Sequence, residues 1–309
     1  MYECTNVRMK GKIKIITIIH TFIHSYIHTL DKEMAIVSFW SNGESETGKT
    51  LSIAAIATQM ALENNFRVLI LNTQYNDMTI EDCFWNTSSK GRFEFQEGRK
   101  TDIDTGIKGL SKAILSNKTS PEIITNYTKT IFKDRLELLT DSQIPREEYE
   151  KQRILLKEMI KMANKYYDIV LVDVEGSLED SIVQGILEIS NIIVGTLSQN
   201  LRKINDYVKL RQQDTLFSGP KVMFIIGRYD KKSAYSIKNI SRHMGEKEIY
   251  GIPYSTLFFE SCNEGKTADF FIKFRKAKLT DNNGLLIDSV RTIVGAIIEK
   301  IRMLQKING

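Results

Sequence analysis

Residues 43–50 of this chain read G-E-S-E-T-G-K-T and match the phosphate-loop pattern G-x-x-x-x-G-K-[ST] at every fixed position. An apolar run over residues 34–40 precedes this loop, and a helix-forming run over residues 51–63 follows it. A strand that leads through a glycine-rich turn into a helix directs several backbone N–H groups at one place, where the helix dipole also favours phosphate. The pattern therefore predicts a nucleotide-binding site, and the flanking runs argue against a chance match.

The fixed positions of the loop have separate tasks. We expect Lys49 to reach the β- and γ-phosphates and the Thr50 hydroxyl to hold Mg²⁺. The whole loop surrounds the phosphates, so the predicted nucleotide-binding residues are Gly43, Glu44, Ser45, Glu46, Thr47, Gly48, Lys49, Thr50 and Leu51.

Composition places the chain among ordinary globular proteins. Of its 309 residues, 42% are apolar and 26% are charged, which allows an ample core in one large or two ordinary domains. The net charge of +5 permits contact with nucleic acid or anionic lipid without requiring it. Cys4, Cys83 and Cys262 are scattered and odd in number, so they predict neither a metal site nor a disulfide framework, and they favour a reducing cytoplasm.

The first 33 residues are apolar in part but carry three histidines spaced four residues apart. A membrane span needs about 20 largely apolar residues, and this stretch is shorter and interrupted by imidazoles. It also lacks the small-residue cleavage site of a secretory signal. We expect residues 1–33 to be a poorly ordered extension, with Met34 as a candidate start, and residues 34–309 to form one nucleotide-binding domain. The intact mass of the native protein would test this.

Strands and helices alternate along the remaining chain. Apolar runs predict strands at residues 34–40, 67–71, 136–139, 168–173, 191–197, 221–226 and 248–253. Amphipathic patterns predict helices at residues 51–63, 107–115, 147–166, 178–189, 204–215, 236–244 and 285–304, and residues 76–100 are expected to form a loop or lid. Such alternation predicts an α/β fold with a doubly wound, mostly parallel sheet, and a nucleotide at the carboxyl ends of its strands.

A second motif lies far from the loop in sequence. Residues 168–173 form an apolar run that ends in an acid, and residues 173–176 read D-x-x-G. A strand of this kind delivers a carboxylate beside Mg²⁺, so Asp173 is the second predicted metal ligand and, with Lys49, a candidate catalytic residue. The backbone of Gly176 is expected to approach the γ-phosphate. The alternative is that Asp173 only caps the following helix.

The chain resembles the MinD/ParA family of dimerising P-loop ATPases. The resemblance rests on residues 34–71, on I-I-G-R-Y-D at 225–230 and on G-I-P-Y at 251–254, and it extends over nearly all of the chain after residue 33. It adds Arg228 and Pro253 to the expected nucleotide contacts. Among subgroups, the chain looks most similar to divergent members such as the TadZ/CpaE-like pilus-localising proteins and the partition-like ATPases of mobile elements.

This resemblance implies an ATP- and Mg²⁺-dependent switch that forms a homodimer on ATP binding. Such proteins position cargo: a plasmid or chromosome segment, or a pilus or secretion apparatus. It also implies a cytoplasmic protein, peripheral to the nucleoid or the membrane, and a protein partner that stimulates turnover. The sequence does not name the cargo or the partner.

The chain departs from the family pattern where hydrolysis is concerned. Glu44 stands where the family has a lysine that reaches the partner's nucleotide, and a carboxylate there repels phosphate. Ser45 and Glu46 replace two glycines, while Asn72 and Gln74 replace an Asp-x-Asp whose second acid orients the attacking water. An amide positions water but does not accept its proton. We therefore expect nucleotide binding with slow or partner-dependent hydrolysis.

Other functions remain open. A scaffold of the same fold that has lost the ATPase chemistry is the main alternative, and a kinase on a P-loop fold is a weaker one, since no arginine-rich lid is visible. Residues 271–278 interleave basic and aromatic side chains, which suits DNA, but an ordinary solvated loop is the preferred interpretation. The closing helix has an apolar side that would suit a membrane surface, but core packing is preferred. Gly227 stands where many relatives have an asparagine that contacts adenine.

Overall fold

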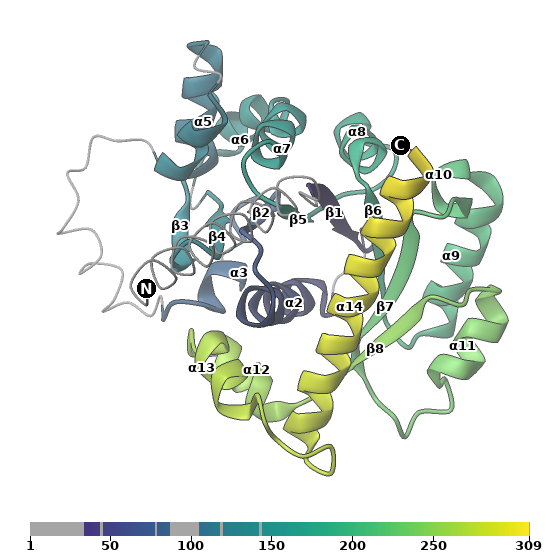
Figure 1. Cartoon of the computed structure of the whole chain (residues 1–309). Coiled ribbons are helices and arrows are strands. Elements are labelled where there is room, and N and C mark those ends of the chain that lie inside the picture. Colours follow the sequence, from purple (N-terminus) through teal and green to yellow (C-terminus); the bar gives the residue numbers. More distant parts are fainter. Residues whose placement is uncertain are drawn as a thin grey trace, which may run out of the picture. The chain divides into compact units, whose positions relative to one another are not determined.

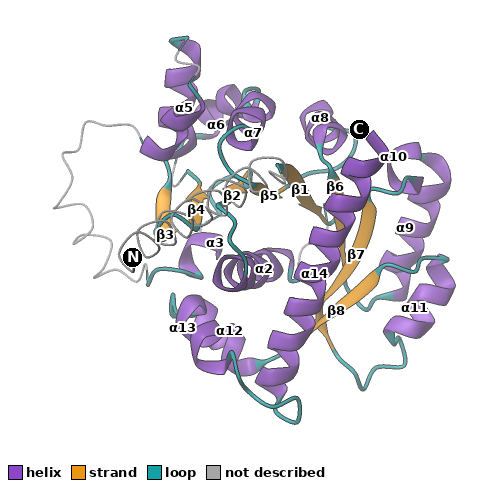
Figure 2. Ribbon diagram, in the orientation of Figure 1, coloured by secondary structure: helices purple, strands orange, loops and turns teal. Residues whose placement is uncertain are grey.

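The computed structural model describes residues 34–43, 46–77, 79–86, 105–117, 120–141 and 144–308. The expected extension at residues 1–33 lies outside these ranges. Eight strands form one sheet in the order β3-β4-β2-β5-β1-β6-β7-β8, which runs through the middle of Figure 2. Neighbouring strands are parallel, except that β3 is antiparallel to β4. The strands are β1 (Ala35–Trp40), β2 (Val68–Asn72), β3 (Lys129–Phe132), β4 (Leu136–Leu139), β5 (Ile169–Asp173), β6 (Ile192–Leu197), β7 (Val222–Tyr229) and β8 (Ile249–Pro253).

Helices cover both faces of the sheet (Figure 1). One face carries α2 (Lys49–Glu63), α3 (Thr79–Asp82), α12 (Thr256–Asn263), α13 (Thr267–Phe274) and α14 (Asn282–Asn308). The other carries α5 (Gly106–Leu115), the 3-10 helix η1 (Pro121–Asn126), α6 (Arg146–Arg153), α7 (Leu156–Asn164), α8 (Ser181–Ile189), α9 (Leu201–Gln213), α10 (Thr215–Ser218) and α11 (Ile237–Met244). The predicted fold class is therefore confirmed.

The central strands are apolar on both faces because both faces are covered. In β1, Val37 and Phe39 join the core beneath α2, while Ile36 and Trp40 join the core on the opposite face. This is the two-residue period of a strand. Ser38 is also buried, and its hydroxyl satisfies its hydrogen-bonding capacity at 2.7 Å from the hydroxyl of Ser190.

The closing helix packs against the body of the fold. The apolar positions of α14, including Ile293 and Ile297, are fully buried and contact α2 and β8. Core packing is thus the correct interpretation, and this apolar side is covered by protein. Within the described residues, none of the helices combines the length and hydropathy needed to cross a bilayer.

Residues 271–278 are only in part the solvated loop that the sequence suggests, since the last four follow the end of a helix and the basic side chains are exposed. α13 runs to Phe274, and Phe270 and Phe271 are buried in the core. Arg275 forms an ion pair with Glu63 at 3.6 Å. The aromatic rings are therefore committed to packing, which removes them as a platform for stacking nucleic-acid bases.

Two further expectations are corrected. The predicted helix at 147–166 is two helices, α6 and α7, which are separated at Ile154 and Leu155. The predicted loop after residue 76 begins with the short helix α3, and residues 87–104 lie outside the described ranges.

Candidate functional site

Strand order places the phosphate-loop residues between the ends of two neighbouring strands. β1 lies between β5 and β6, and Phe39, near the end of β1, is in register with Asp173 at the end of β5. The chain leaves β1 and crosses to β2, whereas β5 leads to β6 on the other side of β1. The chain thus adds strands on opposite sides of β1. Such a reversal of the strand order leaves a crevice at the carboxyl ends of the strands, where ligands bind in open α/β sheets.

The loop itself is built from left-handed backbone. Asn42, Gly43, Glu46 and Gly48 have φ values of 52°, 71°, 62° and 76°. Left-handed residues in a tight turn direct successive N–H groups inward, and such concavities bind anions. Gly48 is also the N-cap of α2, so the amino end of this 15-residue helix opens on the same place. Glu44 and Ser45 lie outside the described ranges.

Lys49, Thr50 and Asp173 meet directly beneath the loop. The Lys49 ammonium donates to the Val174 carbonyl at 2.6 Å and forms an ion pair with Asp173 Oδ1 at 2.8 Å. The Thr50 hydroxyl donates to Asp173 Oδ2 at 3.1 Å. Asp173 is fully buried. The helix-capping alternative for Asp173 does not hold, because the N-cap of α8 is Asp180.

These side chains suit a magnesium ion that binds together with a nucleotide. Mg²⁺ takes oxygen ligands, usually one or two from protein with phosphate and water oxygens completing the shell. The hydroxyl of Thr50 and the carboxylate of Asp173 supply two such oxygens at one point. Among the described residues, no group of three or more His, Cys, Asp or Glu side chains is placed to hold a metal alone. The donor set therefore fits Mg²⁺ that shares its coordination with phosphate.

The amide side chains of Asn72, the last residue of β2, and of Gln74, just after it, contact different neighbours. The Gln74 amide donates to the Thr50 hydroxyl at 3.4 Å, so its side chain faces the metal-binding position. Asn72 instead accepts from the Gln74 backbone at 3.0 Å and donates to the Asp77 carbonyl at 3.1 Å. Gln74 is thus the amide that faces Thr50, whereas Asn72 contacts the loop after β2.

The turn that contains Gly176 is held from below by Trp40. The indole N–H of Trp40 donates to the Gly176 carbonyl at 2.8 Å, and Gly176 has a φ of 116°. Trp40 is fully buried against Tyr207 and Phe217, as expected for a core residue. Its contact with the turn was not predicted, although an indole directly before a phosphate loop offers a donor within reach.

A recess beside the loop collects the other predicted contacts. It is lined by Gly48, Leu51, Ser52, Arg228, Ile252, Pro253, Tyr254, Ser255, Phe258 and Phe259. Arg228 has a left-handed φ of 51°, and its guanidinium lies 6.0 Å from the ring of Phe259. Apolar and aromatic walls with a few polar groups suit a nucleobase. The rings of α12 were missed by the sequence analysis because no helix was predicted there.

Gly227 has a steric role that differs from base contact. A Cβ atom on Gly227 would lie 2.1 Å from the Thr47 carbonyl oxygen, so the strand end and the phosphate loop touch backbone to backbone. Gly227 is therefore needed for the loop to keep its path.

We expect Gly227→Ala to weaken ATP binding about tenfold and to lower the thermal midpoint, since overpacking typically costs about 1–3 kcal/mol. The matched control is Gly219→Ala, whose Cβ would meet nothing closer than the Thr215 oxygen at 3.8 Å. Calorimetric titration and thermal unfolding of both variants measure the difference, and equal behaviour of the two would contradict this role.

Glu46 combines backbone strain with unfavourable charge. A left-handed conformation costs a non-glycine residue about 1–2 kcal/mol, and the carboxylate lies in a loop shaped for anions. We expect Glu46→Gly to tighten ATP binding about tenfold and to raise the thermal midpoint. Glu46→Gln removes the charge but keeps the strain, so it should tighten binding without the gain in thermal midpoint. A loss of affinity in both variants would count against this interpretation.

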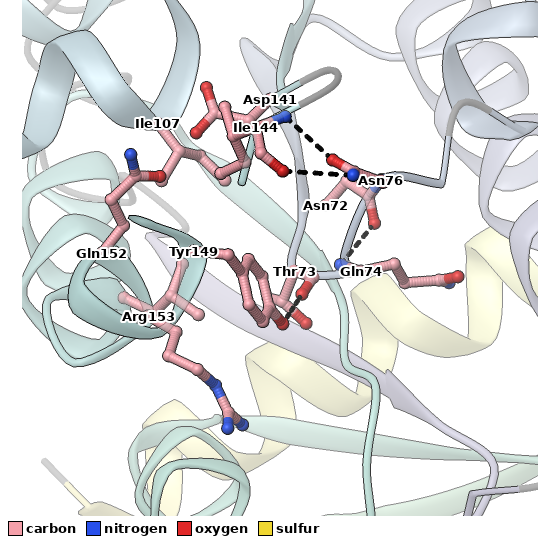
Figure 3. Close-up of a pocket in the computed structure, with 11 residues that line it drawn as sticks. Asn72, Thr73, Gln74, Asn76, Ile107, Asp141, Ile144, Tyr149, Gln152 and Arg153 are labelled. Carbon is pink, nitrogen blue, oxygen red and sulfur yellow. Dashed lines mark hydrogen bonds between the residues drawn. The ribbon is translucent and has the colours of Figure 1, made fainter. Parts of the chain in front are cut away.

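A second pocket lies behind the loop that carries Gln74, and Figure 3 shows its lining. Asn76 and the backbone of Ile144 exchange two hydrogen bonds of 3.2 and 3.0 Å. The Tyr149 hydroxyl donates to the Thr73 carbonyl at 2.7 Å. These contacts tie the loop after β2, which carries Gln74, to α6 and to the residues just before it.

Asp141, at the edge of this pocket, gives folding a dependence on pH. Burial is the main cause that raises its pKa to about 6, against hydrogen bonds from the backbone of Ile107 and Lys108. Its Oδ2 atom is buried with no hydrogen-bond partner among the described residues. A carboxyl whose pKa is raised by folding stabilises the folded state fully below its unfolded pKa of about 3.9, and this contribution is lost as pH rises through about 6.

We therefore expect the free energy of unfolding to fall by about 2 kcal/mol between pH 4 and pH 6 through Asp141 alone. Asp141→Asn keeps an acceptor for the same backbone N–H groups and removes the titration. Denaturant unfolding of both proteins across this pH range should show the difference as a flatter profile for the variant. Parallel profiles would contradict the assignment.

No protein-family model matches the chain, and no curated protein sequence matches it. Solved structures do match. A ParA family ATPase from Chlorobium tepidum superposes with a TM-score of 0.63 at 17% identity, over 84% of this chain and 98% of that chain. MinD in the MinC:MinD cell division complex of Aquifex aeolicus gives 0.56 at 18%, over 84% and 96%. MinD with Mg-ADP from Pyrococcus horikoshii gives 0.53 at 18%, over 81% and 98%. At these identities the likeness shows the fold alone.

Proposed function

We propose that this chain, which has the fold of the ParA and MinD ATPases, is an ATP-binding switch with weak or partner-dependent hydrolysis. The observation that carries the proposal is the contact of Lys49, Thr50 and Asp173 beneath a left-handed loop. The MinD structure with Mg-ADP supports ATP and Mg²⁺ as the ligands.

In the proposed switch, ATP binding replaces the hydrogen-bond partners of a few atoms in the site. Lys49 exchanges the Val174 carbonyl for β- and γ-phosphate oxygens, and charge-assisted contacts of this kind are strong. Thr50 and Asp173 hold Mg²⁺, which supplies charge neutralisation for the phosphates. The Gly176 turn is then the element that senses the γ-phosphate, and its connection to Trp40 carries a shift of the turn into the core.

Slow turnover follows from the groups that face the phosphates. Gln74 is placed to orient water but lacks the basicity to take its proton. Glu46 adds negative charge to the loop. Both features favour a bound state that persists until a partner acts on it.

Positioning of cargo by an ATP-dependent homodimer is the wider role that this proposal assigns. The complex of MinD with MinC supports the idea that a protein partner reads the bound state. DNA and membrane association are weaker parts of the proposal, because the aromatic rings at 271–278 and the apolar side of α14 are both used in the core.

A scaffold that has lost the chemistry is the second candidate. The strained Glu46 and the complete pairing of Lys49 by Asp173 and Val174 favour it. The two candidates differ in whether ATP binds at all.

Titration of the full chain with ATP and Mg²⁺ in a calorimeter separates them, with ADP formation followed in the same sample. Saturable binding with little ADP is the result expected for the switch. An absence of binding would establish the scaffold, and turnover as fast as that of an active relative under the same conditions would overturn slow hydrolysis.

A further inference from the structure

Cys83 and Cys262 meet in the fold although nothing in their spacing predicts it. Cys83 lies in the turn after α3, and Cys262 lies on α12. Their side chains are close enough to influence each other's pKa, and both residues are free thiols that are at most 2% exposed.

The backbone around the two thiols holds them in place. The Thr267 N–H donates to the Cys83 carbonyl at 3.2 Å, and the Thr267 hydroxyl donates to the Cys262 sulfur at 3.4 Å. A Cβ atom on Gly265 would lie 2.4 Å from backbone atoms of Trp85 and Asn86, so the two turns are in direct contact. The approach of the thiols is thus set by both segments.

The two thiols are chemically unequal. The neighbouring Cys83 side chain lowers the pKa of the Cys262 thiol, and the Thr267 hydroxyl acts in the same direction against burial. The same pairing, together with burial, raises the pKa of the Cys83 thiol. Because the thiolate is the reactive form, Cys262 is the nucleophile of the pair and Cys83 is the resolving thiol.

We propose that Cys83 and Cys262 form a reversible disulfide when the protein meets a hydroperoxide. With hydrogen peroxide, the Cys262 thiolate attacks one peroxide oxygen and the O–O bond breaks to give a sulfenic acid and hydroxide, which takes up the proton released by Cys262 and becomes water. Cys83 then attacks the sulfenic sulfur, the S–O bond breaks, and a second water leaves with the Cys83 proton. Two thiols lose two electrons in all, and the peroxide gains them. A dithiol reductant reverses the reaction by exchange.

A small, uncharged oxidant suits this location. The pair is buried in the apolar core, but the adjoining Asn86 and Asn263 are exposed. A hydroperoxide therefore needs only a local opening of these turns, whereas a bulky disulfide reagent needs a larger one.

The bond would act on the nucleotide site, and this part rests on the proposed function. α12 carries Phe258 and Phe259 into the base recess, one turn before Cys262. Cys83 directly follows α3, the short helix that comes after the Gln74 loop in the chain. Since a disulfide brings its sulfurs to about 2.0 Å, it would shift α12, whose Phe258 and Phe259 line the recess. We expect ATP binding about fivefold weaker in the oxidised form.

Thiol counting tests the bond in the full chain with Cys4→Ser, which leaves only this pair. Denatured protein should take up two maleimide labels before hydrogen peroxide, none after it, and two again after dithiothreitol. Peptide mapping without reductant should find the Cys83–Cys262 cross-link. Two labels retained after peroxide, irreversible oxidation, or cross-links only between chains would overturn the proposal. The further variant Cys262→Ser should form no internal cross-link.

Calorimetry with ATP on the reduced and oxidised forms tests the consequence. Weaker ATP binding by the oxidised form supports the proposed effect of the disulfide on the nucleotide site. Equal ATP affinities of the two forms would overturn that effect. Failure of both forms to bind ATP would instead overturn the proposed function. The two results are distinguishable because the disulfide itself is detected separately, by labelling and peptide mapping.

Discussion

Lys49→Ala should weaken binding of Mg-ATP by about 100-fold or more. The ammonium contributes charge-assisted contacts to the phosphates, and hydrogen bonds to charged groups are worth about 1.5–3 kcal/mol each. Calorimetric titration against the wild type measures the loss. Binding within about threefold of the wild type would show that the phosphate loop is not the site.

This variant also destabilises the protein, and a control has to separate the two effects. Lys49 forms an ion pair with the fully buried Asp173, and stranding a buried charge costs about 3–5 kcal/mol. Combining Lys49→Ala with Asp173→Asn removes the stranded carboxylate. The double variant should recover most of the thermal midpoint, while binding stays lost. Recovery of binding together with stability would mean that Lys49 matters only for folding.

Gln74→Asp should raise the rate of ADP formation by about 10- to 100-fold. Its side chain faces the Thr50 hydroxyl, so a carboxylate there can accept the proton of the attacking water. General base catalysis typically contributes about 10²–10⁴, and a newly placed carboxylate should achieve only the lower part of that range. A phosphate-release assay at saturating ATP measures the gain.

Asn72→Asp is the matched control for this gain. The Asn72 side chain is turned toward the Asp77 carbonyl in the loop after β2 and toward the Thr140 hydroxyl after β4. A carboxylate at this position should leave turnover unchanged. An increase equal to that of Gln74→Asp, or no increase in either variant, would contradict the assignment of Gln74 as the residue beside the water.

Local patterns were sufficient to predict that Lys49, Thr50 and Asp173 lie together, while their contact with phosphate and Mg²⁺ stays a prediction. The loop pattern fixed Lys49 and Thr50, and the apolar run before Asp173 placed the carboxylate at a strand end. Both are signals that lie within a few consecutive residues. The sheet followed from the same logic, because buried parallel strands are continuous apolar runs.

Contacts between distant segments were not predictable in this way. No residue pattern near Gly227 predicts that its backbone contacts Thr47. The spacing of Cys83 and Cys262 in the sequence likewise does not predict that their side chains lie close together. Residues 271–278 misled for a different reason. These eight residues include only the last turn of α13, which is too short to show a helical period. Over the whole helix, Phe270, Phe271 and Phe274 face the core.

The contact between Gly227 and Thr47 has a consequence for biosynthesis. The phosphate loop is made early by the ribosome, yet one of its supports, the end of β7, emerges only after most of the chain has been translated. The loop of a nascent or truncated chain lacks this support, so its observed backbone path belongs to the completed sheet. Nucleotide occupancy would then mark finished molecules and, by binding only the folded state, protect them from proteolysis.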